Sequence, residues 1–428
     1  LAPSEGIGRN VAEPVVDMLF PAGSKGRIPI VAVTGTNGKT TTTRLNAHIA
    51  KTMGYKVGFT TSDGIYIQNR MMEKGDCTGP VSAKFVLMDP TIDYAVLECA
   101  RGGLLKAGLA FDKCDISIVT NVTADHIGLK DIDSVEEMAK VKSVVPETTR
   151  KEGYAILNAD DDLVFDMRKN LECNLVLFSM DENNPRIKAH CERGGVAAVL
   201  EDGWVSIIKG TWKIRVEKVV NIPLTLGGKA AFMIQNILPC VAAAFVQNFK
   251  IEDLKLALNT FIPSPTMTPG RMNVFKFKHF EMLVDFAHNP DGFQAISNYL
   301  AKVEMHPKVG VIAAAGDRRD EDIRELGRIA GRTFDEIIIR QDKNLRGRTD
   351  EEIMNLLKEG IFEINPNMPV ICINPEADSI KYCIENAKKG SHITVCSDVI
   401  AEALNLIMQY KEKDDQFEFH KEEIPNVH

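Results

Sequence analysis

The fold is indicated most directly by the stretch Ile28-Pro-Ile-Val-Ala-Val33-Thr34-Gly35-Thr-Asn-Gly38-Lys39-Thr40-Thr41-Thr42. Its first six residues have the pattern of a buried strand, and a helix is predicted from about Lys39 to Met53. A glycine-rich turn between a strand and a helix directs backbone N–H groups and the positive end of the helix toward phosphate. The stretch therefore predicts a nucleotide-binding α/β domain.

The side chains of this turn have separate expected roles. Lys39 is expected to reach the β and γ phosphates, and Thr40 to offer its hydroxyl to Mg²⁺. The spacing departs from the usual phosphate loop, because Val33 stands five positions before Gly38 and the nearest glycine is Gly35. The alternative is a glycine-rich turn with a solvated lysine. The predicted nucleotide contacts are Gly35, Thr36, Asn37, Gly38, Lys39, Thr40 and Thr41.

Beyond this turn, short apolar runs alternate with stretches of helical length. The runs at 94–98, 116–120 and 174–178 have the length of buried strands, so they predict a mostly parallel sheet. Residues 196–220 predict an antiparallel edge of hairpins. Alternation restarts after the proline-rich segment 263–270, which predicts a domain boundary near residue 268. The expected parts are a lead-in arm (1–26), a nucleotide domain (27–268) and a second α/β domain (269–428).

Composition excludes several classes of protein. The chain has 428 residues, 44% of them hydrophobic, and a net charge of −8 without a long basic run. These values argue against a disordered chain and against a nucleic-acid-binding surface. No apolar run approaches the length of a membrane helix. Nine cysteines without a CxxC pair favour reduced thiols in a cytoplasm. The start at Leu1, without Met, suggests the later part of a longer polypeptide.

Two further metal-ligand candidates follow predicted strands. Glu98 ends the run 94–98, and Asp125-His126 comes shortly after the run 116–120. In an open α/β sheet, ligands gather at the carboxyl ends of the strands, where the phosphate turn also lies. Thr40 and Glu98 are therefore expected to hold one Mg²⁺, and His126 is a candidate ligand of a second. His126 is the weaker of the two because Mg²⁺ prefers oxygen ligands. The alternative is a structural role for either residue.

Five ordered motifs across some 260 residues resemble the Mur ligases and folylpolyglutamate synthetases. They are Thr34-Gly-Thr-Asn-Gly-Lys-Thr-Thr, the Glu98 strand, Thr120-Asn-Val-Thr-Ala-Asp-His126, Pro269-Gly-Arg271 and Asp285-Phe-Ala-His-Asn-Pro290. The resemblance implies an ATP- and Mg²⁺-dependent amide-forming ligase. It also implies an α/β fold with a central P-loop NTPase-type domain, whose sheet is mostly parallel, and a Rossmann-like C-terminal domain.

The resemblance also assigns roles to particular residues. Asn236 and Arg271 would contact the nucleotide, and Asp285 would hold its ribose end. His288 and Asn289 would lie nearby, and His288 is the candidate for the base that deprotonates the incoming amine. A lysine of this family is often carbamylated and then binds metal. Lys142 fits that role best, and Lys140 is its rival because the spacing from His126 varies; a solvated helix face is the alternative for both.

Further stretches resemble the Mur-ligase-like C-terminal half of cyanophycin synthetases: residues 58–67, 75–83, 97–109 and 345–348, and the first residues from Leu1. This resemblance implies L-arginine as the donor, a polyaspartate-backboned cyanophycin primer as the acceptor, an upstream ATP-grasp half and a homo-oligomer. Another Mur-type ligase, such as a pseudomurein peptide ligase or a folylpolyglutamate synthetase, and an inactive scaffold remain as alternatives. Charge and location suggest substrate contacts at Thr78, Ser82, Arg101, Asp342, Arg346 and Arg348.

Overall fold

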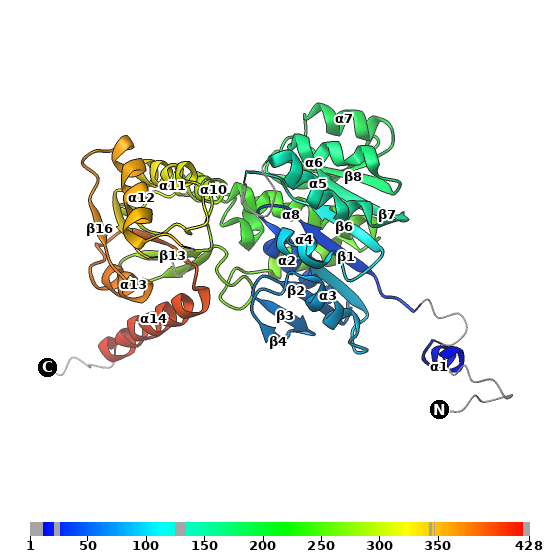
Figure 1. Ribbon diagram of the computed structural model, residues 1–428, viewed down its shortest axis with the longest axis horizontal. Coiled ribbons are helices and arrows are strands. Elements are labelled where there is room, and N and C mark those ends of the chain that lie inside the picture. Colours follow the sequence, from blue (N-terminus) through cyan, green and yellow to red (C-terminus); the bar gives the residue numbers. More distant parts are fainter. Residues whose placement is uncertain (1–11, 21–25, 125–133, 342–344, 346, 423–428) are drawn as a thin grey trace.

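The computed structural model describes residues 12–20, 26–124, 134–341, 345 and 347–422. Two sheets, each covered by helices, make up these residues, and the short helix α1 (Ala12–Leu19) stands apart from both in Figure 1. The prediction of an α/β fold with a large, mostly parallel sheet and a second sheet is confirmed.

The first sheet has eleven strands and centres on β1 (Ile30–Thr34), the strand before the phosphate turn. The strands from β9 to β2 run parallel, whereas β10 and β11 at one edge and β3 and β4 at the other are antiparallel. The hairpin edge predicted for residues 196–220 is thus confirmed. In spatial order the strands are β11 (Trp212–Lys218), β10 (Trp204–Lys209), β9 (Val196–Glu201), β8 (Asn174–Ser179), β7 (Thr149–Asn158), β6 (Cys114–Val119), β1, β5 (Tyr94–Glu98), β2 (Val57–Thr61), β3 (Gly64–Ile67) and β4 (Arg70–Lys74).

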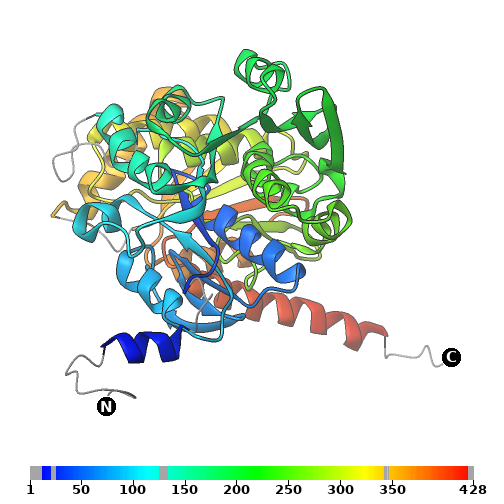
Figure 2. The ribbon, with the colours of Figure 1, turned by 90° about the vertical axis from the view of Figure 1, so that its right-hand side faces the viewer.

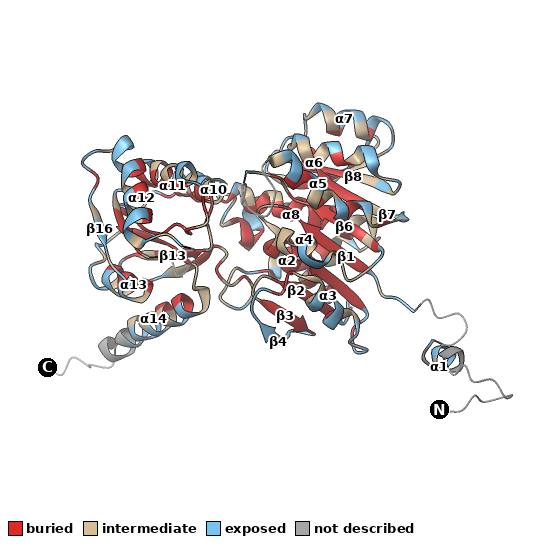
Figure 3. Ribbon diagram, viewed as in Figure 1, coloured by how far each residue is buried: buried red, intermediate tan, exposed pale blue. Residues whose placement is uncertain are grey.

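Helices cover both faces of this sheet because successive strand residues point to opposite sides. Val31 and Val33 of β1 belong to the core cluster under α2 (Lys39–Thr52), α8 (Ala231–Val246) and α9 (Ile251–Thr260). Ile30 and Ala32 point to the other face. That face carries α3 (Pro80–Leu87), α4 (Arg101–Ala107), α5 (Val135–Glu147), α6 (Asp162–Asp166) and α7 (Pro185–Glu192). Figure 3 shows the buried strands between the two helical layers. Short 3₁₀ turns at Met167–Asn170, Val219–Asn221 and Pro223–Thr225 complete this part.

The second sheet begins after a connecting segment, residues 261–272, that follows α9. All of its neighbouring strands are parallel except the first pair. Its spatial order is β12 (Asn273–Lys276), β13 (Glu281–Asp285), β17 (His392–Cys396), β14 (Lys308–Ile312), β15 (Glu336–Ile339) and β16 (Val370–Cys372). Its helices are α10 (Pro290–Leu300), α11 (Asp320–Thr333), α12 (Asp350–Ile364), α13 (Glu376–Glu385) and α14 (Ile400–Glu422), and Figure 2 shows α14 projecting at the C-terminal end.

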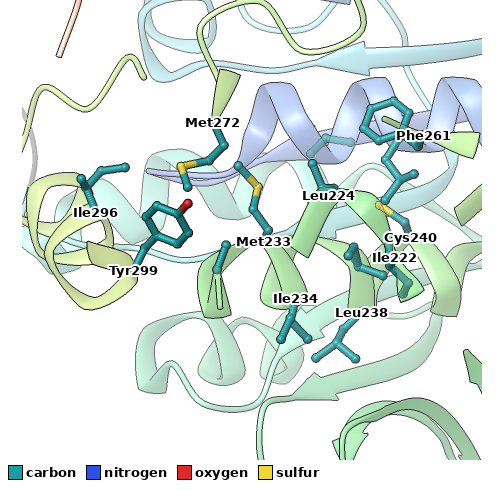
Figure 4. Packing of buried hydrophobic residues seen from close by; sticks show 14 of the residues in the cluster. Ile222, Leu224, Met233, Ile234, Leu238, Cys240, Phe261, Met272, Ile296 and Tyr299 are labelled. Carbon is teal, nitrogen blue, oxygen red and sulfur yellow. The ribbon is translucent and has the colours of Figure 1, made fainter. Parts of the chain in front are cut away.

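The two parts share an apolar contact. Met233 of α8, Met272 of the connecting segment and Ile296 and Tyr299 of α10 belong to one buried cluster. Figure 4 shows Met233 and Met272 between the central helices and the side chains of α10. Burial of such side chains stabilises a contact by about 25 cal/mol for each Å² of apolar surface removed from water. The connecting segment is therefore packed against both parts.

Candidate functional site

The phosphate turn joins β1 to α2 and is held by the end of the neighbouring strand β6. The N–H of Thr36 donates to the Asn121 carbonyl oxygen, and the N–H of Asn37 to Asn121 Oδ1, both at 2.8 Å. Gly38 precedes the first helical residue with φ 85°, a conformation that disfavours a side chain. A Cβ there would lie 2.2 Å from Asn236 Oδ1. Lys39 Nζ donates to the Thr36 carbonyl oxygen at 2.7 Å.

Glu98 lies beside this turn at the end of β5. Thr40 Oγ1 donates to its carboxylate at 3.0 and 3.3 Å, and the Ser62 N–H donates at 3.3 Å. Burial raises the pKa of Glu98, while Lys39 and the Thr40 hydroxyl oppose this shift. A buried carboxylate close to two hydroxyl oxygens forms the all-oxygen donor set that Mg²⁺ prefers, and a cation would offset the cost of burying the charge. The residues therefore fit a magnesium ion.

Lys142 and Lys140 occupy different sides of α5. Lys142 is buried, and its Nζ donates to the Gly35 carbonyl oxygen of the phosphate turn at 2.8 Å. Lys140 is exposed. Of the two rivals, Lys142 is therefore the one beside the turn. Asp125 and His126 lie outside the described residues.

The second sheet contributes residues on the opposite side of the turn. Asp285 ends β13 and accepts a hydrogen bond from the Met272 N–H at 2.9 Å; burial raises its pKa, and Arg271 opposes this shift. The Arg271 guanidinium lies 4.6 Å from the Phe286 ring centre. Asn289 caps α10, and its Nδ2 donates to Asn37 Oδ1 at 3.2 Å. His288 Nδ1 lies 2.9 Å from the Phe286 carbonyl oxygen.

A cleft of about 810 Å³ lies between these two sets of residues, at the carboxyl ends of strands from both sheets. Many of the residues predicted from the sequence line it. These are Thr36, Asn37, Gly38, Lys39, Thr40, Thr41, Thr78, Glu98, Asn236, Arg271, Asp285 and His288. The charge of the lining is strongly unbalanced. Among the described residues of the lining, the acidic side chains are Asp76, Glu98, Asp160, Asp161, Asp285, Asp291, Asp317 and Asp398, against the cations Lys39, Arg271 and Arg318.

Other predicted residues lie elsewhere. Among the described ones, Gly35, Ser82, Arg101, Lys142, Asn289 and Arg348 do not line the cleft. Gly35 is part of the phosphate turn, Lys142 contacts the turn through the Gly35 carbonyl oxygen, and Asn289 contacts it through Asn37. Arg348 forms ion pairs with Asp320 and Glu352, at 2.7 and 3.4 Å. Asp342 and Arg346 lie outside the described residues.

Several cleft residues were not predicted as site residues. Among them are Ser62, Asn121, Asp161, Asp317, Arg318 and Asp398. Glu98 was singled out as a charged residue at the end of a strand, and the same rule applies to Asp317, which follows β14, and to Asp398, which follows β17. The sequence pattern indicated Ser62 less clearly, because this residue reaches the site through the turn that joins the paired strands β2 and β3.

Comparison with known proteins places this geometry in a family. The Mur ligase middle domain matches residues 33–244, and the "Mur ligase, glutamate ligase domain" matches residues 270–399. The chain belongs to the Mur ligase family. Both matches include residues of the cleft, which therefore lies between the two family domains.

Curated relatives of this Mur ligase chain include the cyanophycin synthetase of Geminocystis herdmanii. The two are 48% identical over 410 residues, which are 96% of this chain and 47% of the relative. The cyanophycin synthetase of Synechocystis sp. is also 48% identical, over 96% of this chain and 47% of its own length. The chain spans about half the length of these relatives. The predicted resemblance is confirmed.

Solved structures of Mur ligase relatives share the fold. E. coli FolC in complex with DHPP and ADP has a TM-score of 0.67 at 17% identity, and the match covers 92% of this chain and 90% of that structure. A pseudomurein peptide ligase type C from Methanothermus fervidus has a TM-score of 0.60 at 20% identity, covering 90% and 79%. The predicted class of enzyme, an ATP-dependent carboxylate–amine ligase, is confirmed by this family membership. Within the described residues, no helix is long and apolar enough to cross a membrane.

Proposed function

We propose that this chain joins L-arginine to the aspartate side-chain carboxylates of a cyanophycin primer, using ATP and Mg²⁺. The identity with cyanophycin synthetases supports the reaction. The class of amino-acid donor is inferred from one observation, the acidic cleft, in which the described carboxylates outnumber the cations beside the phosphate turn. A cleft of this charge attracts metal ions and a cationic amino acid.

The chemistry needs an activated carboxylate, because a free carboxylate does not acylate an amine in neutral water. In the proposed reaction a carboxylate oxygen of the primer attacks the γ-phosphorus of ATP, and ADP leaves. The amine then attacks the carbonyl carbon of the acyl phosphate, and inorganic phosphate leaves as the amide forms. Lys39 is proposed to hold negative charge that develops on the transferred phosphoryl group. Closure of the two domains would exclude water from the acyl phosphate.

Magnesium is proposed to bind beside the phosphate turn. Thr40, Glu98 and Ser62 would hold it, with His126 and Lys142 proposed for a second ion. When bound, Mg²⁺ supplies positive charge near the phosphate oxygens. Asn236, Arg271, Asp285 and Asn289 are proposed to contact the nucleotide.

His288 is proposed to accept the proton of the incoming amine. Its Nδ1 lies 2.9 Å from the Phe286 carbonyl oxygen, which can only accept a hydrogen bond. In the neutral ring Nδ1 therefore carries the hydrogen, and Nε2 carries the lone pair that accepts a proton. His288 also lines the cleft, where the amine would react.

The amino-acid dependence of phosphate release tests the proposed function. Purified protein is given ATP, Mg²⁺, an arginine-deficient cyanophycin primer and each amino acid in turn, with Lys39→Ala as the control for contaminating ATPases. Arginine should be preferred and lysine should be a poor but detectable donor. A site built for the guanidinium leaves acceptors unsatisfied with lysine, at a cost of about 1 to 3 kcal/mol.

The other outcomes separate the alternatives. A preference for a non-basic amino acid would reject the cyanophycin reaction and favour another Mur-type ligase. Silence with every donor would favour an inactive scaffold, and repeating the assay with the chain joined to an ATP-grasp half would then be decisive. That upstream half and a homo-oligomeric assembly are part of the proposal.

Lys142 is proposed to carry a carbamate. Its nitrogen would keep one N–H after carbamylation, so the hydrogen bond to the Gly35 carbonyl oxygen could persist. We expect Lys142→Ala to lose most amine-dependent phosphate release and to regain part of it with a small carboxylate such as formate, because only the anion is needed near the metal. Lys140→Ala should keep the wild-type rate. A wild-type protein without a carbamate signal after ¹³C-bicarbonate labelling, observed by NMR, would contradict the assignment.

A further inference from the structure

Arg44 is a buried guanidinium close to the site that the proposed chemistry does not use. It lies on α2, four residues after Thr40, so the two side chains share one face of the helix. Only 5% of Arg44 is exposed. Its guanidinium lies 4.6 Å from the Tyr66 ring centre and 5.6 Å from that of Phe59. A charged group buried in this way requires specific partners.

One partner of Arg44 is the turn that carries Ser62. Arg44 Nη2 donates to Asp63 Oδ2 and, at 2.7 Å, to the Tyr66 hydroxyl oxygen, while the Tyr66 hydroxyl donates to Asp63. Asp63 and Ser62 form the two-residue turn between β2 and β3. The Ser62 hydroxyl lies 3.0 Å from Thr40 Oγ1. Arg44 therefore fixes the residue next to Ser62.

The other partner of Arg44 is the connecting segment. Arg44 Nη1 donates to the Met267 carbonyl oxygen at 3.3 Å. Four residues further along the chain, Arg271 enters the cleft. The N–H of Arg271 donates to the Thr268 carbonyl oxygen at 2.9 Å, so Arg271 is tied to the same turn of the chain. One guanidinium thus joins the phosphate helix, the Ser62 turn and the segment between the domains.

We propose that Arg44 is a positioning residue that couples the connecting segment to the Ser62 turn and the phosphate helix. A movement of the second domain then displaces Ser62 and Thr40, because Arg44 contacts both the connecting segment and the Ser62 turn. This inference rests on the proposed function for its catalytic consequence, but the coupling itself is a property of the fold. A lysine cannot replace Arg44, because one ammonium lacks the planar fork that serves the Asp63 carboxylate, the Tyr66 hydroxyl and the Met267 carbonyl together.

Kinetics of Arg44→Lys test the catalytic consequence. We expect kcat for arginine-dependent phosphate release to fall roughly 10- to 100-fold, because small displacements at a phosphoryl-transfer site are costly. KM for ATP should stay within about threefold, since the phosphate turn is retained. Arg168→Lys is the matched control, because Arg168 also covers a ring, Phe165, and bonds a carbonyl and a carboxylate, but these partners lie two and three residues away in its own segment. The control should keep the wild-type kcat.

Hydrogen exchange without substrates tests the coupling itself. The Gly75 and Cys77 amides donate to the backbone of Asp63 and Thr61, and the Thr268 and Arg271 amides report on the connecting segment. In Arg44→Lys all four should lose protection, and in Arg168→Lys none should. Asp63→Asn should also lower the protection of the amides in both regions, although Asp63 lies in only one of them. Loss of protection at only one region in Arg44→Lys would overturn the proposal.

Failure of the variant to fold and failure of the proposed function are distinguished as follows. If Arg44→Lys does not fold, Tyr66→Phe removes only the hydroxyl and should produce the same paired loss of protection to a smaller extent; unchanged protection there would also overturn the proposal. If the wild-type protein turns over no ATP with any donor, alone or joined to an ATP-grasp half, the proposed function fails, and the exchange experiment still decides the coupling. Paired exposure together with an unchanged kcat would reject the catalytic role of Arg44.

Discussion

Lys39→Ala is expected to leave the fold intact and to lower amine-dependent phosphate release by roughly 10² to 10³, or about 3 to 4 kcal/mol, which is typical for one preorganised electrostatic contact. The lysine faces the phosphate turn, where its Nζ bonds the Thr36 carbonyl oxygen. Its charge is needed mainly in the transition state, so kcat should fall more than the affinity for nucleotide. Phosphate release and thermal melting measure the two effects.

Lys51→Ala provides the control for this experiment. Lys51 lies in the last turn of the same helix and is exposed. Its removal should change neither the melting temperature nor the rate. Phosphate release near the wild-type rate in Lys39→Ala would reject the phosphate-turn assignment.

Glu98→Gln is expected to separate stability from activity. We expect phosphate release to fall by roughly 10², because the proposed metal loses its buried carboxylate ligand. In EDTA the variant should melt at the same temperature as the wild type or higher, since an amide avoids the cost of burying a charge. Magnesium nucleotide should raise the melting temperature of the wild type more than that of the variant.

The pH dependence of this difference follows from the raised pKa of Glu98. A carboxyl group whose pKa is higher in the folded than in the unfolded protein binds more protons when folded, so its contribution to stability is lost as pH rises through the folded pKa. In EDTA the melting advantage of Glu98→Gln should therefore grow from acidic toward neutral pH. Glu136→Gln, at an exposed position of α5, should show no such trend. An advantage that shrinks with pH would contradict the assignment.

The sequence alone was sufficient for the centre of the first sheet. The buried run, the glycines and the following helix are local patterns, so β1 and α2 were predicted to within a residue or two. The choice between Lys142 and Lys140 also had a local signal. Met138, Lys142 and Val145 recur at intervals of four and three residues, which places Lys142 on the apolar face of α5.

The parts that sequence patterns could not predict depend on contacts between distant segments. Ser62 reaches Thr40 only because β2 pairs with β5 on one side and β3 on the other. Arg44 contacts Met267, 223 residues away in the chain, and no local periodicity indicates such a partner. The substrate contact suggested at Arg348 rested on charge and location, which do not reveal that Asp320 and Glu352 pair with this side chain.

The amide pair between Asn37 and Asn289 has a consequence for the working cycle of the protein. It joins the phosphate turn to the start of α10 through a hydrogen bond of 3.2 Å between two uncharged groups. Such a bond can be exchanged for water at a net cost of about 1 kcal/mol, which is close to thermal energy. The amide pair can therefore open and re-form at this point many times during one turnover. The phosphate turn and the start of α10 can thus separate locally, while the apolar contact between α8 and α10 keeps the two parts together.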